Sequence, residues 1–190
     1  MTDAMRQGST VELPPEACLQ HGSEDQGRPL RVCFVCTGNT CRSPMAEAVA
    51  NALAQAELED YPAAVRASLT PRVQATSAGL YASVGEPISC HAVQALEAAG
   101  VAAVDGNDYH KHTATPLDAD IVNRSELLVA MTPSHAMELL LRYPEAAQKI
   151  LCMPMPISDP FGGDLETYRR CLDEIAKGVR ALWFGESAHE

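Results

Sequence analysis

One loop in this sequence carries a cysteine and an arginine with five residues between them, at the junction of an apolar run and a helix-forming segment. Residues 36–43, here called the phosphate loop, read CTGNTCRS. Gly38 permits a turn with positive φ, and such a loop directs backbone N–H groups inward as an anion-binding nest. Arg42 adds a planar, permanently charged fork that can grip two phosphoryl oxygens. A lone cysteine is more often a small core residue, but this electropositive setting predicts that Cys36 is a thiolate nucleophile beneath a bound phosphate.

The elements around this loop alternate between short apolar strands and amphipathic helices. Met45, Val49 and Leu53 recur every four residues, which predicts a helix over 44–57. The alternation indicates a parallel sheet covered on both faces, and ligands bind in such sheets at the carboxyl ends of strands, where residue 36 falls. The expected strands are 30–35, 72–77, 126–131 and 149–153, and the other expected helices are 87–99, 116–124, 133–142 and 165–183.

Composition limits the classes of function. The 190 residues suffice for one domain, and 46% apolar with 21% charged residues is typical of a globular protein. The net charge of −11 argues against a nucleic acid partner, because binding to a phosphate backbone requires a basic face. A phosphate site in so acidic a protein must concentrate its positive potential in backbone N–H groups and one or two arginines.

The cysteine content and the N-terminal segment indicate a reducing compartment. Seven cysteines is an odd number for a disulfide framework, no apolar stretch approaches the roughly 18 residues of a membrane span, and residues 1–6 lack a signal-peptide pattern. We therefore expect a cytoplasmic protein with no membrane partner. Residues 1–28 show no apolar period and are expected to form a disordered N-terminal extension before one folded domain at 29–190.

The phosphate loop and several later segments resemble a known family. Residues 35–48 read VCTGNTCRSPMAEA and closely resemble the signature of the low-molecular-weight phosphotyrosine protein phosphatase family. The resemblance covers roughly residues 30–183 in the family's order, and it continues in SAG at 77–79, HTATPL at 112–117, LVAMT at 128–132 and DPFGG at 159–163. It implies a flavodoxin-like α/β fold of the phosphotyrosine phosphatase I type, with a four-stranded parallel sheet and helices on both faces. It also implies a catalytic domain at 29–190 that dephosphorylates proteins through a phosphocysteine intermediate without a cofactor, and we expect a monomer.

Asp159 matches the general acid of that family. Phosphoryl transfer to a thiolate requires a proton for the departing atom and then a base for the attacking water, and one carboxylate can serve in turn. Pro160 favours an extended backbone at Asp159, and the glycines at 162–163 let this loop, residues 154–164, bend over the phosphate loop. An Asp-Pro pair alone is more commonly a surface turn, whereas beside the cysteine and arginine it favours the acid. Asp164 is expected only to cap the final helix.

The residue at position 40 bears on the choice of substrate. Family members that act on phosphotyrosine usually carry a bulky aliphatic residue there, and Thr40, with FGG after the acid, resembles the protein-arginine phosphatase branch. A hydroxyl makes a smaller and more polar wall, which suits a guanidinium leaving group better than a phenol ring. Tyr81 and Phe161 are candidate walls that would stack on either planar group, and simple core packing is the alternative for each. Phosphoarginine is favoured, and phosphotyrosine is the alternative substrate.

The resemblance implies roles for further residues around the phosphate loop. The phosphate-binding residues would be Thr37, Gly38, Asn39, Thr40, Cys41 and Arg42, and the network supporting the loop would be Asn39, Ser43, Ser77 and His112. Ser43 falls at the expected N-cap, where its hydroxyl can either donate to the thiolate or cap the helix. His110 and His112 would share one face of a strand, but two histidines without a third ligand do not make a metal site, so no metal is expected.

Cys41 supplies a second thiol in the phosphate loop. A thiolate next to a thiol can form a reversible disulfide under oxidants, which would switch the activity off and protect against overoxidation. The alternative is that Cys41 simply packs beneath the loop. The other cysteines of the expected elements are interpreted as core or incidental residues: Cys33, Cys90, Cys152 and Cys171.

Other functions share part of this pattern. Thioredoxin-linked arsenate reductase has the same loop but needs a downstream cysteine pair, and only Cys90 lies between the second strand and Cys152. A non-catalytic module that binds phosphorylated residues, or a thiol redox sensor, would be indicated by a lost nucleophile, arginine or acid. All three are present, which favours an enzyme.

Overall fold

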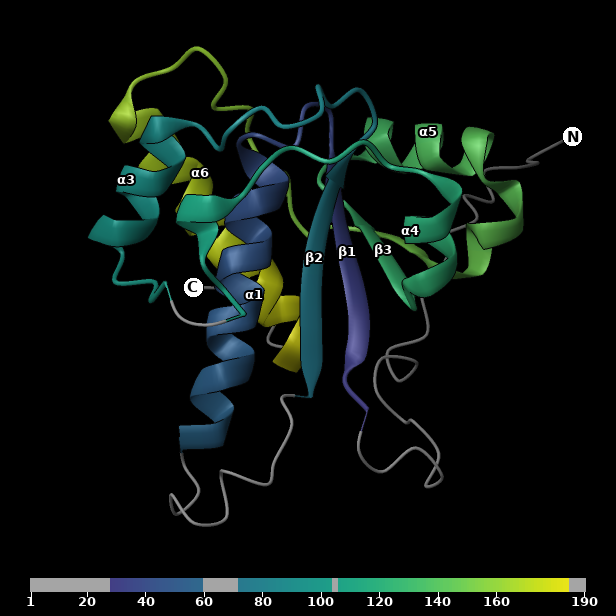
Figure 1. Ribbon diagram of the computed structural model, residues 1–190, viewed down its shortest axis with the longest axis horizontal. Helices are drawn as coiled ribbons and strands as arrows, with labels where there is room; N and C mark the ends of the chain where they lie inside the picture. The colour runs from purple at the N-terminus through teal and green to yellow at the C-terminus, as the bar shows by residue number, and fades with distance from the viewer. Residues whose placement is uncertain (1–27, 60–71, 104–105, 185–190) are drawn as a thin grey trace, which may run out of the picture.

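The computed structural model describes residues 28–59, 72–103 and 106–184, which are built around a four-stranded parallel sheet (Figure 1). The strands are β1 (Leu30–Cys36), β2 (Val73–Gly79), β3 (Leu127–Ala130) and β4 (Ile150–Cys152), in the order β2-β1-β3-β4. The predicted fold is confirmed, and all four predicted strands are present with slightly shifted ends. Residues 1–27 of the predicted N-terminal extension lie outside the described residues.

Helices cover both faces of this sheet, as predicted. On one face lie α1 (Arg42–Glu59), α3 (Cys90–Ala98) and α6 (Leu165–Phe184), and on the other lie α4 (Ala119–Arg124) and α5 (Pro133–Arg142) (Figure 1). The sequence pattern does not predict two 3₁₀ turns, η1 (Tyr109–Lys111) and η2 (Pro144–Lys149).

The predicted starts of α3 and α4 are too early. At the predicted start of α3, Pro87 forms an isolated bridge with Thr113, and at the predicted start of α4, Pro116 forms one with Gly79. Each helix therefore begins a few residues later. Both prolines lie in segments that pass over the carboxyl end of the sheet. The bridges therefore tie those segments to the neighbourhood of the phosphate loop.

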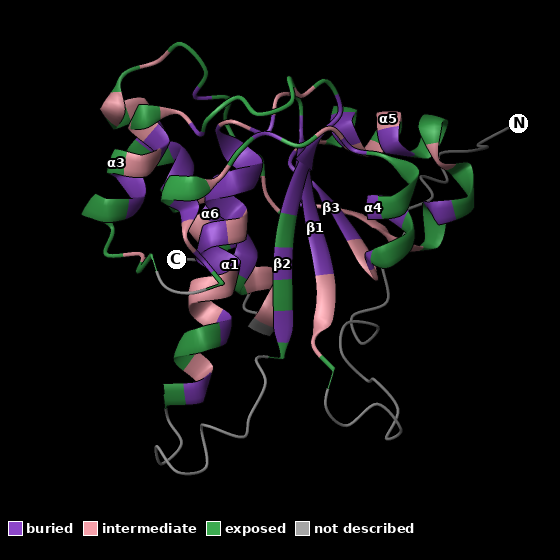
Figure 2. Ribbon diagram, viewed as in Figure 1, coloured by how far each residue is buried: buried purple, intermediate pink, exposed green. Residues whose placement is uncertain are grey.

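The side chains of β1 contribute to two separate cores. Phe34 packs in the cluster with α1 and α6, whereas Cys33 and Val35 pack in the cluster with α4 and α5, because successive side chains of a strand point to opposite faces. Residues 32–36 are all buried, which explains the continuous apolar run of a central parallel strand. Figure 2 shows the same gradient, with β1 buried towards its carboxyl end and partly exposed near its start.

The carboxyl ends of the strands meet at one edge of the sheet. Cys36 ends β1 directly opposite Gly79, which ends β2. The loop at 154–164 follows β4 and reaches the same edge, so the parallel topology brings Asp159 to the phosphate loop (Figure 1). No helix within the described ranges has the length and apolar content needed to cross a bilayer.

Candidate active site

The sulfur of Cys36 lies at the base of the phosphate loop, with hydrogen-bond donors around it. Cys36 is 3% exposed, and its Sγ accepts from the backbone N–H of Asn39 (3.3 Å) and lies 3.0 Å from Oγ of Ser43. The loop contains the expected turn with positive φ, but the left-handed residue is Asn39, with φ of 56°, and not Gly38. Asparagine tolerates this region because its short polar side chain can form local hydrogen bonds.

The side chain of Asn39 is fully buried and its polar atoms are all bonded. Its Nδ2 donates to Oγ of Ser43 (2.9 Å) and of Ser77 (2.8 Å), and its Oδ1 accepts from the N–H of Thr115 (2.8 Å). Nε2 of His112 lies 2.9 Å from the backbone oxygen of Asn39. The structure thus brings together all four residues that were predicted to support the loop, and it adds Thr115.

Ser43 does not occupy the N-cap position that the sequence suggests. The helix α1 already includes Arg42, so Ser43 lies in its first turn. Because Nδ2 of Asn39 donates to the Ser43 oxygen, the Ser43 proton is left to point at Sγ of Cys36 or, more distantly, at the oxygen of Ala78 (3.4 Å). The geometry favours donation to the sulfur.

Gly79 allows the phosphate loop to pass close to the end of β2. A Cβ atom at this position would lie 2.8 Å from the backbone oxygen of Thr37 and 3.0 Å from the backbone nitrogen of Asn39. Both separations are too short for a side chain, so any larger residue would displace the loop.

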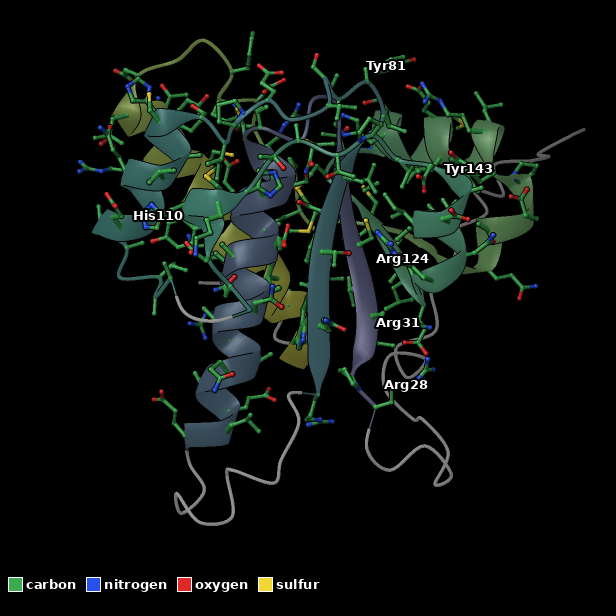
Figure 3. All side chains as sticks on the ribbon, viewed as in Figure 1. Arg28, Arg31, Tyr81, His110, Arg124 and Tyr143 are labelled. Atoms are coloured by element: carbon green, nitrogen blue, oxygen red, sulfur yellow. The ribbon has the colours of Figure 1, made fainter. Side chains whose placement is uncertain are left out.

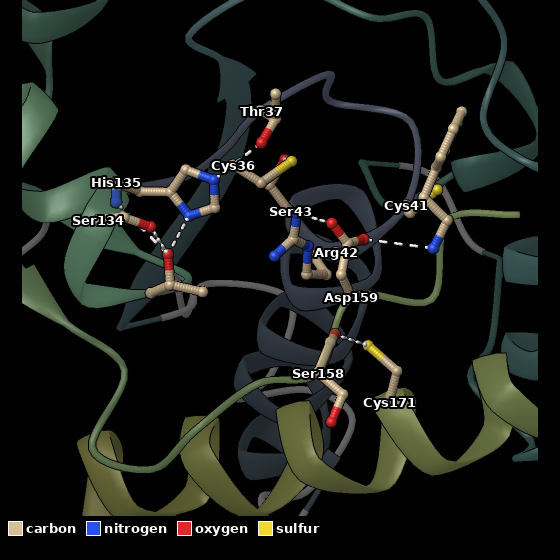
Figure 4. Close-up of polar contacts among 12 residues, drawn as sticks. Cys36, Thr37, Cys41, Arg42, Ser43, Ser134, His135, Ser158, Asp159 and Cys171 are labelled. Carbon is tan, nitrogen blue, oxygen red and sulfur yellow. Dashed lines mark hydrogen bonds and ion pairs between the residues drawn. The ribbon is translucent and has the colours of Figure 1, made fainter. Parts of the chain in front are cut away.

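Arg42 and Asp159 are in contact across the mouth of the site. Nη2 of Arg42 lies 2.8 Å from Oδ2 of Asp159, which joins the phosphate loop to the loop at 154–164 (Figure 4). The arginine side chain is 8% exposed and the aspartate side chain is 56% exposed, so the guanidinium is held in place while the carboxylate can still meet solvent. Oδ1 of Asp159 also accepts from the N–H of Phe161 (3.2 Å).

Glu47 is a supporting residue that the sequence analysis missed. Oγ of Ser77 donates to its Oε2 (2.6 Å), and the same oxygen lies 3.8 Å from Nδ1 of His112. Burial raises the pKa of Glu47 to about 7 and lowers the pKa of His112, so both groups are driven towards their neutral forms. A signal was present, because Glu47 stands four residues after Ser43 and therefore on the same face of α1.

His135, on α5, is a second residue that the sequence analysis missed. Its Nε2 lies 2.9 Å from Oγ1 of Thr37 and its Nδ1 lies 2.7 Å from Oγ1 of Thr132 (Figure 4). Burial, with the nearby charge of Arg42, lowers the pKa of His135. No pattern in the sequence indicates that a residue of α5, which lies 98 positions after Thr37, contacts the phosphate loop.

The three predicted selectivity residues differ in packing. Thr40 is half-buried, and its backbone oxygen accepts from the N–H of Ser89 (2.8 Å). Tyr81 and Phe161 are 63% and 79% exposed, which rules out core packing for both aromatic rings. Figure 3 places Tyr81 beyond the carboxyl ends of the strands, and the guanidinium of Arg142 stacks on its ring at 4.5 Å from the centroid.

Cys41 is buried within the phosphate loop, and its thiol contacts a residue of α6. Its Sγ lies 3.1 Å from the hydroxyl of Tyr168, on α6, and burial raises its pKa. All the described cysteines are free thiols in this state. Asp164 caps α6 as predicted, accepting from the N–H (2.9 Å) and hydroxyl (2.7 Å) of Thr167.

The two histidines that were considered as a metal pair do not share a strand face. His110 lies in η1 with its Nε2 3.8 Å from Glu97, whereas His112 follows that turn and contacts Asn39. The expectation of a common face is wrong because this segment forms a 3₁₀ turn.

Comparison with known proteins gives consistent relatives. The family model for low molecular weight phosphotyrosine protein phosphatases matches residues 31–189. The protein-arginine-phosphatase of Geobacillus stearothermophilus is 34% identical over 77% of this chain and 89% of its own length, and that of Bacillus subtilis is 30% identical over 80% and 93%. A probable low molecular weight protein-tyrosine-phosphatase, EpsP, of Ralstonia nicotianae is 29% identical over 79% and 91%.

Solved structures show the same similarity. A low molecular weight protein tyrosine phosphatase from T. tengcongensis superposes with a TM-score of 0.67 at 34% identity, covering 80% of this chain and 97% of that one. The YwlE arginine phosphatase, in a cysteine-to-serine mutant with phosphorylated active site serine, superposes with a TM-score of 0.65 at 30% identity, covering 80% and 92%.

Proposed function

We propose that this protein removes phosphate from other proteins and that phosphoarginine residues are its preferred substrate. The chain belongs to the low molecular weight phosphotyrosine protein phosphatase family. The observation that carries the proposal is the pair of hydrogen-bonding groups at the sulfur of Cys36, from Asn39 at 3.3 Å and Ser43 at 3.0 Å. Such donors stabilise a thiolate. The phosphorylated serine in the related YwlE mutant supports a covalent intermediate on Cys36.

In the proposed reaction, Sγ of Cys36 attacks phosphorus, and the bond from phosphorus to the departing nitrogen or oxygen breaks as the S–P bond forms. Arg42 and the N–H groups of residues 37–41 hold the other three oxygens. Asp159 gives a proton to the departing atom, and it then takes one from the water that hydrolyses the phosphocysteine. The side chains and water suffice for both steps, so we propose no cofactor.

One feature supports phosphoarginine over phosphotyrosine, which is the half-buried Thr40 of the phosphate loop with its hydroxyl. Sequence identity does not separate the two substrates, because the arginine phosphatase of Geobacillus stearothermophilus and the tyrosine phosphatase of T. tengcongensis are both 34% identical to this chain. Phosphotyrosine remains the second candidate, and the exposed rings of Tyr81 and Phe161 would accept a phenol ring as readily as a guanidinium.

The chemistry is tested by Cys36→Ser and Asp159→Ala on a phosphoarginine peptide. We expect the first variant to be inactive and the second to lose about 10²- to 10⁴-fold in kcat/KM, as is typical when a general acid is removed. Cys90→Ser, an exposed thiol on α3, is the matched control and should retain activity. Full activity in both site variants would refute the mechanism.

The substrate is tested by comparing phosphoarginine and phosphotyrosine peptides for the wild type, Thr40→Ile and Thr40→Val. We expect the ratio of the two kcat/KM values to fall roughly 10-fold or more in Thr40→Ile, within the range that one or two methyl groups produce in a pocket. Thr40→Val keeps the shape and removes the hydroxyl, so it separates size from polarity. An unchanged ratio in both variants would remove the support for arginine specificity.

We further propose that the protein acts as a monomer in the cytoplasm on phosphorylated proteins. The free thiols at all described cysteine positions support a reducing compartment. Sedimentation at micromolar concentration tests the oligomeric state, and a species of twice the chain mass would contradict the monomer.

A further inference from the structure

The residue immediately before Asp159 is tied to α6 by all of its polar groups. The carboxylate of Glu174 accepts from the N–H of Ser158 (Oε2, 2.7 Å) and lies 3.0 Å from its hydroxyl oxygen (Oε1). Sγ of Cys171 donates to the backbone oxygen of Ser158 (3.3 Å), a contact visible in Figure 4 beside Asp159. Three bonds from two residues of one helix therefore fix both the position and the orientation of this peptide.

The anchor itself is rigid. Cys171 and Glu174 stand three residues apart on one face of α6. Cys171 and its neighbour on the helix, Ile175, are fully buried in the core that α6 forms with α1 and α3. Burial raises the pKa of Cys171 to about 12, so its thiol keeps the proton that it donates. Pro160, on the other side of Asp159, is buried as well.

Asp159, in contrast, has few contacts that would hold it. Its side chain is 56% exposed, and it forms hydrogen bonds with Arg42 and with the N–H of Phe161 within its own loop. During the reaction, Arg42 must turn to the phosphate oxygens. The position of the carboxylate then depends on the backbone at residue 158.

We infer that Glu174 is a positioning residue for the general acid, which it holds over the phosphate loop through Ser158. The inference rests on the proposed role of Asp159. A carboxylate that accepts two hydrogen bonds from one residue acts as a clamp, because charge-assisted bonds are about twice as strong as neutral ones and two of them fix orientation. Loss of the clamp frees the loop, and displacement of a catalytic group by about 1 Å can lower a rate roughly 100-fold.

The leaving group distinguishes positioning of the acid from a general structural role. Phenyl phosphate releases a phenol with a pKa of about 10, which needs the proton from Asp159. 2,4-Dinitrophenyl phosphate releases a far less basic phenolate, which departs without a proton. We expect Glu174→Gln to lower kcat/KM for phenyl phosphate by about 10-fold or more and to change it less than about 2-fold for the dinitrophenyl ester.

Four further variants make the experiment decisive. Asp159→Asn should show the same dependence on the leaving group in stronger form, and Asp173→Asn, a neighbouring exposed carboxylate on α6, should show none. Adding Glu174→Gln to Asp159→Asn should cause no further loss, because a positioning residue acts only through the group it holds. Ser158→Ala, which keeps the N–H bond to Glu174, should give a smaller effect in the same direction.

Each outcome has one meaning. An equal loss for both esters in Glu174→Gln, an additive loss in the double variant, or no effect of Glu174→Gln would overturn the inference while leaving the proposed function intact. If Asp159→Asn itself shows no dependence on the leaving group, the proposed role of Asp159 fails instead. Should Glu174→Gln not fold, Ser158→Ala provides the same comparison.

Discussion

Asn39 shows how a single residue keeps the phosphate loop in shape. Its backbone has a φ of 56°, its N–H reaches the sulfur of Cys36, and its side chain binds Ser43, Ser77 and Thr115. A non-glycine residue in this left-handed region is uncommon and is retained when the surroundings determine it. The three side-chain bonds therefore stabilise the turn that directs the N–H at the nucleophile.

Glu47 should make the stability of the protein depend on pH. Burial raises the pKa of its carboxyl from an ordinary 4.5 to about 7, so the folded state holds a proton that the unfolded chain releases. This contribution to stability is full below about pH 4.5 and is lost as pH rises to about 7. We expect Glu47→Gln to flatten that decline by about 1–3 kcal/mol, measured by urea unfolding across this range.

His112 also contributes to the pH dependence of stability, with a sign opposite to that of Glu47, so the experiment needs a control variant. Burial lowers the pKa of His112, so its contribution is lost as pH falls below its ordinary 6.5. Glu59→Gln, at an exposed position of the same helix, should leave the pH profile of the wild type unchanged. A Glu47→Gln profile parallel to the wild type would show that this carboxyl is not held protonated.

Cys41 should protect the nucleophile from irreversible oxidation. Hydrogen peroxide converts the thiolate of Cys36 to a sulfenic acid, and the thiol of Cys41 can then displace water to form a disulfide. We expect the wild type to lose two thiols and to recover activity with dithiothreitol, whereas Cys41→Ser does not recover. Because burial raises the pKa of Cys41, closure should accelerate as pH rises. Recovery of Cys41→Ser to the same extent as Cys90→Ser, the exposed-thiol control, would contradict this role.

At the scale of the elements, α6 supports the loop that carries Asp159 at several points. Asp164 caps its first turn, Tyr168 meets Cys41 of the phosphate loop, and Glu174 holds Ser158. The helix also packs against α1 and α3, so it links the two loops of the site through one rigid body.

The cap of α6 can be tested separately. Bonds from Thr167 hold the pKa of Asp164 below its ordinary 3.8, so its stabilising effect is present above that pH and is lost as pH falls through the lowered value. We expect Asp164→Ala to lower Tm by about 2–4 °C at neutral pH, as loss of an N-cap typically does in a domain of this size. Scanning calorimetry should show a smaller difference near pH 3. Asp164→Asn, which keeps a capping oxygen, should stay close to the wild type, and equal Tm values for all three proteins at pH 7 would contradict the capping role.

At the scale of the whole molecule, an acidic protein holds a site for an anion. The net charge is −11, yet the edge where the strands end gathers the inward N–H of Asn39, the start of α1 and the guanidinium of Arg42. Local dipoles and one charge act at a few ångströms, whereas charges farther than about 10 Å are screened by salt. The parallel topology thus creates a positive site without a basic surface.

The predicted domain boundary leads to a test on the whole chain. The sheet begins at Leu30, and Arg28 contacts Glu126 (Nη2–Oε1, 2.6 Å), so a chain that starts at residue 28 keeps the whole sheet and this contact. We expect this shortened chain to retain kcat/KM within about 2-fold and stability within about 0.5 kcal/mol, the usual range for changes at a surface. A start at residue 33, inside β1, is the matched control and should fail to fold. A loss of activity in the chain from residue 28 would assign residues 1–27 a part in the reaction.

Local patterns in the chain were enough to predict the fold and most of the chemistry. The apolar runs and helical periods identified each strand and long helix of the described ranges, because hydrophobic period and caps act over a few residues. The spacing of Cys36 and Arg42, with the resemblance that it carries, led to Asp159, and the structure brings that carboxylate to Arg42.

Contacts between distant segments could not be read in this way. His135 and Glu174 reach the site from two different helices, and the left-handed turn falls at Asn39 rather than at Gly38 because Ser77 and Thr115 arrive from other segments to bind the Asn39 side chain. The sequence shows which residue types can form hydrogen bonds or ion pairs, but the packing of the helices on the sheet decides which of them come into contact. The nucleophile and the phosphate-binding arginine therefore follow from neighbouring residues in the sequence, whereas the residues that support them follow from the fold.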